Sequence, residues 1–181
     1  GCLAAMSLIV SIQGQELLAL WTFNNTNSVS AVVGNGEYTL VSPVASQFYT
    51  GSDSDPAATG NYGLSLSSFP EQATGAKSAG VQFAVSTVGY QNIRFTFDLR
   101  GSATAARNAV VQYSVNGADF IDAAPFVITR DSAFLTGLTV DLSAVAAASN
   151  NPNFALRIVS DFNDAAGYKA VRDGSAYSIS G

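Results

Sequence analysis

The stretch QNIRFTFDLR, residues 91–100, decides the fold class of this chain. Apolar residues occupy every second position of it, at Ile93, Phe95, Phe97 and Leu99. A period of two places these side chains on one face of a strand and the polar ones on the other. One dry face and one wet face are typical of an antiparallel sheet that packs on a partner sheet. The stretch therefore predicts a half-buried strand.

Similar short segments recur along the chain, separated by turn signals. Strands are expected at residues 17–23, 37–41, 63–67, 80–86, 108–115, 138–142 and 154–162. The pair Asn116-Gly117 is a strong hairpin signal. Residues 42–61 are the longest stretch expected to be irregular. Residues 141–148 predict one short helix, capped by Asp141 or Ser143. We predict an all-β fold, an antiparallel β-sandwich of the jelly-roll, carbohydrate-binding-module-like type, forming a single domain over residues 15–181.

The composition excludes one class of partner. Charged residues make up 12% of the 181 residues, against about a quarter in an ordinary soluble domain. The net charge is −5, and the eight Lys and Arg residues are scattered along the chain. A nucleic-acid partner needs clustered cations to displace counterions from phosphates, so we predict no binding of nucleic acid.

The beginning of the sequence has the features of a targeting segment. Residues 2–12, CLAAMSLIVSI, are uncharged and mostly apolar, long enough for a signal-peptide core but too short to span a bilayer as a helix. We predict that residues 1–14 belong to a signal peptide cleaved after Gly14, that the protein is exported to the exterior or the cell surface, and that no transmembrane segment is present. The alternative is a buried first strand or helix.

Three segments together resemble a known group of proteins. They are LLALWTFNN at residues 17–25, RFTFDLRGSATAARNAVVQYSVNGADF at residues 94–120 and DLSAVAAASNNPNFALRIVSDF at residues 141–162. They are similar to the β-sandwich ectodomains of bacterial exported proteins of the PEP-CTERM-anchored type. The resemblance implies a jelly roll whose activity is mostly undescribed. The sorting signal itself is not in the sequence, and residues 175–181 end without a strand, which leaves a closing strand beyond residue 181 open.

Most catalytic chemistries are missing from the sequence. The chain has no histidine, which excludes serine and cysteine triads, histidine-based zinc sites and the usual near-neutral general base. Glycoside hydrolysis would need only two facing carboxylates. Most Asp residues, such as Asp119, Asp131 and Asp173, fall at turns or strand ends, where their turn-forming hydrogen bonds explain them. We therefore predict that the protein is not an enzyme.

Two sets of residues are candidates for binding. Asp53 and Asp55 form an acidic pair within residues 42–61, where carboxylates could hold a structural calcium ion, although a solvated loop explains them too. Arg94, Asp98 and Arg100 share the polar face of residues 91–100 and could bond the hydroxyls of a ligand. The alternative for these three is an ordinary surface ion pair.

These observations together predict a secreted or surface-displayed binding module that acts in extracellular-matrix or glycan adhesion without catalysis. The expected partner is an extracellular polysaccharide or a surface protein. The alternatives are a purely structural surface or matrix protein, and an accessory domain of a secreted hydrolase.

Overall fold

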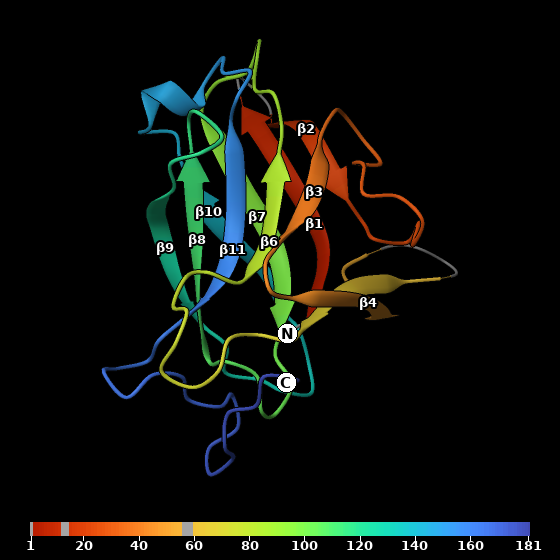
Figure 1. Cartoon of the computed structure of the whole chain (residues 1–181). Helices are drawn as coiled ribbons and strands as arrows, with labels where there is room; N and C mark the ends of the chain where they lie inside the picture. Colours follow the sequence, from red (N-terminus) through yellow and green to blue (C-terminus); the bar gives the residue numbers. More distant parts are fainter. Residues whose placement is uncertain (1, 12–14, 56–59) are drawn as a thin grey trace.

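Two antiparallel sheets, packed face to face, make up the protein (Figure 1). The computed structural model describes residues 2–11, 15–55 and 60–181. Their strands are β1 (Cys2–Ser11), β2 (Gln15–Trp21), β3 (Glu37–Val41), β4 (Ala45–Thr50), β5 (Tyr62–Ser67), β6 (Gly80–Ala84), β7 (Ile93–Arg100), β8 (Asn108–Ser114), β9 (Ile121–Val127), β10 (Leu135–Asp141) and β11 (Ala155–Asp161). The predicted all-β antiparallel sandwich is confirmed. The jelly-roll, carbohydrate-binding-module-like topology stays a prediction.

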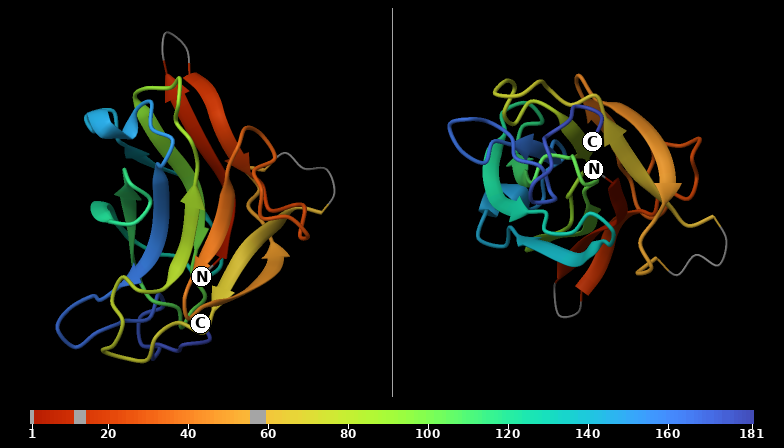
Figure 2. Two further views of the ribbon diagram at one scale, coloured as in Figure 1. Left: turned by 45° about the horizontal axis from the view of Figure 1, so that its top comes forward. Right: turned by 90° about the horizontal axis from the view of Figure 1, so that it is seen from below.

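The sheets differ in size and regularity. One has five strands in the order β3-β6-β11-β8-β9 and lies in front in Figure 1. The other has six strands in the order β10-β7-β1-β5-β4, with β2 paired to β1. The views in Figure 2 show that the hairpin of β4 and β5 projects from the side of the sandwich.

The core lies between the sheets and is rich in aromatic rings. Phe95 and Phe97 of β7 are almost completely buried, as the alternation predicts, and their rings stack with centroids 4.8 Å apart. Phe83 of β6 reaches Phe95 from the opposite sheet at 6.4 Å and contacts Trp21 edge to face at 5.2 Å. Burying side chains of this size contributes about 1.5–3 kcal/mol each. This aromatic chain joins the two sheets.

Two predicted elements are corrected by the structure. Residues 42–61, expected to be irregular, contain β4, whose side chains are nearly all exposed. An edge strand that buries neither face shows no alternation, so periodicity could not reveal it. The predicted helix is reduced to the 3₁₀ turn Ala146–Ala148, with no side-chain cap. Asp141 ends β10, and its carboxylate accepts a hydrogen bond from the Ser143 N–H at 2.9 Å, which forms a turn instead of a helix start.

The segment expected to form a signal peptide is paired within the six-stranded sheet. β1 pairs with β7 along most of its length, from Cys2 opposite Arg100 to Val10 opposite Ile93, and with β2 on its other side. A strand was the alternative considered for this segment. Cleavage after Gly14 lies outside the described residues, and the signal peptide at residues 1–14 stays a prediction. Within the described part of the chain, no helix is long and apolar enough to cross a membrane.

Candidate functional site

The polar side chains of β7 are bonded to their neighbours. Arg94 forms an ion pair with Asp141 of β10, with Nη2 2.7 Å from Oδ2, and the two residues are directly opposite in the sheet. The Thr96 hydroxyl lies 3.1 Å from that of Thr139 in the next cross-strand pair on this face. Exposed cross-strand pairs of this kind contribute well under 1 kcal/mol each. Their polar groups are used within the sheet.

Asp98 departs from the expected solvent-facing position. It is only 4% exposed, because the turn after β4 lies over this part of the outer face. The Ser54 hydroxyl and the Gly137 N–H both donate hydrogen bonds to its carboxylate, the latter at 2.8 Å. Arg100 places its guanidinium over the ring of Phe134, 4.9 Å from the centroid. Of the three predicted ligand-binding residues, Asp98 is a buried hydrogen-bond acceptor between the turn after β4 and strand β10, and the two arginines have partners.

The two acidic residues predicted to hold calcium lie in different environments. Asp53 is exposed, whereas Asp55 is buried and its Oδ2 accepts a hydrogen bond from the Asn24 side chain at 2.7 Å. Among residues 2–11, 15–55 and 60–181, no cluster of three or more acidic or cysteine side chains could hold a metal ion. Residues 56–59 of the same loop lie outside the described residues. Calcium binding by Asp53 and Asp55 stays a prediction.

A polar groove on the outer face of the five-stranded sheet has a different character. It spans about 860 Å³ above β3, β6 and β11, at the end where these strands meet the loops of residues 34–36, 116–117 and 152–153. The cross-strand neighbours Ala84 and Ala155 form part of its floor. Gly36 lines one side, where an added Cβ would lie only 2.9 Å from the Trp21 ring. Trp21 is buried, so core packing requires glycine at this position, while two alanines form part of the groove floor.

Four polar side chains around this groove are free. Glu37 comes from the start of β3 and Gln82 from β6, whereas Asn35 and Asn153 lie in the loops before β3 and β11. None of the four forms a side-chain hydrogen bond or an ion pair with any residue that the structure describes. Together they offer amide donors, amide acceptors and one carboxylate. We call Asn35, Glu37, Gln82 and Asn153, with the groove between them, the amide groove.

A row of bonded side chains continues from the amide groove across the sheet. Gln82 is the cross-strand neighbour of Arg157, and Arg157 that of Gln112. Arg157 donates from Nε to the Gln112 side-chain oxygen at 2.5 Å and lies over the ring of Phe120, 4.0 Å from its centroid. Gln112 in turn donates to the Asp122 carboxylate at 2.6 Å. These contacts hold the Arg157 guanidinium on the strand next to Gln82 of the amide groove.

The charges at the far end of this row affect one another. The pKa of Asp122 lies below its usual value, chiefly because Lys77 donates a hydrogen bond to it at 2.5 Å. The pKa of Lys77 is raised by the same bond. Burial lowers the pKa of Arg157, and the Asp122 charge partly offsets this. Arg157 titrates far above neutral pH and remains a cation.

The chemistry available in the amide groove is recognition by hydrogen bonds. Glu37 is the one carboxylate among the described residues that line it, so the groove lacks the pair of carboxylates that glycoside hydrolysis requires. Amides both donate and accept, which suits the hydroxyl groups of a sugar, each of which does the same. The groove is thus equipped to bind a hydroxyl-rich ligand.

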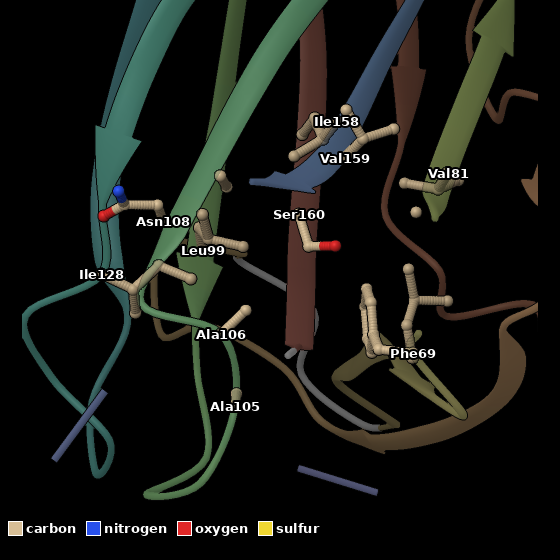
Figure 3. Close-up of a pocket in the computed structure, with 13 residues that line it drawn as sticks. Phe69, Val81, Leu99, Ala105, Ala106, Asn108, Ile128, Ile158, Val159 and Ser160 are labelled. Atoms are coloured by element: carbon tan, nitrogen blue, oxygen red, sulfur yellow. The ribbon is translucent and has the colours of Figure 1, made fainter. Parts of the chain in front are cut away.

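The opposite end of the sandwich contains a pocket of another kind. Figure 3 shows Leu99, Ile128, Ile158 and Phe69 pointing into a largely apolar space between the sheets. One of its polar side chains, Asn108, donates a hydrogen bond to the Phe162 carbonyl at 3.2 Å. The Ser160 hydroxyl is bonded to that of Tyr168, and the remaining lining is mostly apolar, which suits a hydroxyl-rich ligand poorly.

Sequence reasoning did not find the amide groove. Gln82 and Arg157 are outward-facing residues of predicted strands, but nothing local shows that β6 and β11 are neighbours. Glu37 begins a predicted strand, and no local pattern connects it with either of them. The small residues Ala84 and Ala155 are paired across β6 and β11, but only Ala84 is exposed, and neither residue marks a groove in the sequence. No family model, no curated protein and no solved structure matches the chain.

Proposed function

We propose that this protein is an exported binding module that holds a neutral polysaccharide in the amide groove, without catalysing a reaction on it. The observation that carries the proposal is the group of four unbonded polar side chains around a floor of small residues. Amides without a partner among the described residues can bond a ligand without first breaking a contact within the protein. Arg157 on Phe120 extends the same surface along the sheet.

Charge favours a neutral ligand over an acidic one. The chain has a net charge of −5, and Glu37 would repel a uronate or sulfate placed in the amide groove. Arg157, the nearest cation of the row, has its Nε bonded to Gln112. A chain of uncharged sugars meets no repulsion and can bond both the amides and Glu37.

Export and the absence of catalysis belong to the same proposal. A low content of charged residues and an apolar segment at residues 2–12 support export. The lack of histidine and of a second carboxylate in the amide groove supports binding without turnover. Because residues 2–11 also pair with β7 and β2 as β1, mass determination of the N-terminus of the exported protein tests whether the chain is cleaved after Gly14 or keeps this strand.

A glycan array with the full chain, followed by titration calorimetry on the polysaccharides that bind, tests the function. We expect saturable binding to a neutral polysaccharide, weakened at least tenfold by Gln82→Ala combined with Asn153→Ala, because two of the three free amides of the groove are lost. Gln91→Ala is the matched control, since Gln91 is an exposed glutamine just before β7 on the other sheet. Binding that survives the double substitution would exclude the amide groove, and loss of binding in EDTA would instead implicate a metal ion.

A further inference from the structure

The outer edge of β4 has unpaired backbone groups. β4 ends the six-stranded sheet and pairs only with β5 (Figures 1 and 2). Just beyond the strand, the Gly51 N–H donates to the Asn61 carbonyl at 3.0 Å. The backbone N–H and C=O groups point to alternate sides along an antiparallel strand. Those of Gln47 and Tyr49 therefore point towards β5, as those of Gly51 do. Those of Ser46, Phe48 and Thr50 point away from it. These outward groups have no backbone partner within the described residues.

Three other strands at sheet edges carry features that hinder pairing. β9 contains Pro125, which cannot donate to a ladder of backbone hydrogen bonds, and Asp122, which places a charge on the strand. β10 is interrupted by a bulge around Gly137, which has φ +67°. The start of β3 is covered by the preceding segment, since the Tyr38 N–H donates to the Val29 carbonyl at 3.0 Å. β4, with the sequence ASQFYT, has no proline, glycine or charge, and its register with β5 is regular.

We propose that β4 is the interface of a symmetric dimer, in which it pairs antiparallel with β4 of a second copy of this chain. A two-fold axis perpendicular to the sheet at Phe48 places Phe48 opposite its own copy and Ser46 opposite Thr50. In this register, every outward N–H of the three residues faces an outward C=O of the other copy. The two six-stranded sheets then form one continuous sheet.

A second copy fits this edge better than an unrelated chain, for two reasons. Each copy carries a net charge of −5, yet β4 has no charged residue, so two copies meet where repulsion along the strands is smallest. The strand is also complementary to itself, because Gln47 of one copy lies opposite Tyr49 of the other. Within one copy the Tyr49 hydroxyl already donates to the Gln47 side chain at 2.6 Å, which shows that the two side chains share a face.

Sedimentation velocity of the full chain, from about 10 µM to about 1 mM, tests the dimer. We expect a concentration-dependent shift from monomer to dimer, and a rise of at least tenfold in the dissociation constant for Ser46→Pro. Proline removes an outward N–H but keeps the pairing with β5, and its φ suits an edge strand. A thermal melt checks that the variant folds. A sedimentation coefficient that stays monomeric over the whole range overturns the proposal.

A charge exchange tests the register. Gln47→Lys with Tyr49→Lys places like charges opposite each other across the two-fold axis and should abolish the dimer. Gln47→Glu with Tyr49→Lys places opposite charges there and should retain it. Thr136→Lys on β10 is the control for an added charge at the other edge of the sheet, and it should leave the dimer unchanged. If both double variants behave alike, or if Thr136→Lys disrupts the dimer, β4 is not the interface. Dimerisation is measured without glycan, so its failure would leave the proposed function untouched.

Discussion

The two sheets both carry polar rows on their outer faces, but the rows differ in how they are bonded. On β7, Arg94, Thr96 and Asp98 each bond to a neighbouring strand or loop. In the amide groove of the other sheet, Gln82 and Glu37 have no partner among the described residues. Alternating polar residues therefore have two different uses, and only the pattern of bonds across the strands distinguishes them.

The difference separates stability from recognition. A polar group that is satisfied inside the protein must lose its partner before it can bind a ligand, which costs about as much as the new bond returns. A surface group without such a partner gives up only its hydrogen bonds to water when it binds a ligand. We therefore expect substitutions on β7 to change the free energy of unfolding, and substitutions in the amide groove to change ligand affinity.

Deleting residues 1–14 should have the largest effect and would test whether the six-stranded sheet depends on β1. This deletion removes the strand between β7 and β2, and with it the backbone pairing of β7 on that side. We expect the melting temperature, measured by differential scanning calorimetry, to fall by roughly 10 °C or more. An unchanged melting temperature would agree instead with the removal of this segment as a signal peptide, and would mean that β1 is dispensable.

The direct comparison of the two faces comes from a pair of single substitutions. Asp98→Ala removes a buried carboxylate that accepts from both Ser54 and Gly137, and leaves the Gly137 N–H without its partner. We expect it to lower the free energy of unfolding by about 2–4 kcal/mol without changing glycan affinity. Gln82→Ala should do the reverse, with a change in stability below about 0.5 kcal/mol and a clear loss of affinity.

Chemical denaturation and calorimetric titration of both variants provide the measurement for this comparison. If Gln82→Ala destabilised the protein as much as Asp98→Ala, the amide groove would be a structural surface. If Asp98→Ala weakened glycan binding, the polar row of β7 would belong to the site, as first predicted from the sequence.

The features that sequence reasoning found are local. The alternation from Ile93 to Leu99 predicts a strand because each residue's face depends only on its neighbours in the chain. The burial of Asp98 depends on Ser54, and the amide groove depends on the pairing of β6 with β11. Both are contacts between segments far apart in the sequence. Local periodicity carries no information on them, and this explains why the fold class was predictable whereas the candidate site was not.

The smallest expected effect is the pH dependence of stability that comes from Asp122, which is bonded to Lys77 and Gln112. The pKa of Asp122 is lowered chiefly by the hydrogen bond from Lys77, and then by that from Gln112. A lowered pKa means that the folded state favours the carboxylate. Its contribution to stability is therefore fully present above the ordinary value of 3.8 and is lost as the pH falls through the lower folded value.

Asp122→Asn should remove this contribution and leave the rest of the row in place. Because the side chains of Lys77 and Asp122 are exposed by 37% and 47%, we expect the variant to be less stable by only about 0.5–1 kcal/mol at pH 5–8. The difference from the unchanged protein should shrink below pH 4, as urea denaturation at a series of pH values would show. If the difference in stability persists unchanged at pH 2, its cause is not the loss of the charge pair. The introduced amide would then disturb Gln112 and, through it, Arg157. Such a result would indicate that Asp122 and Gln112 hold the Arg157 guanidinium in position. A substitution among these bonded side chains would then also alter the surface next to the amide groove.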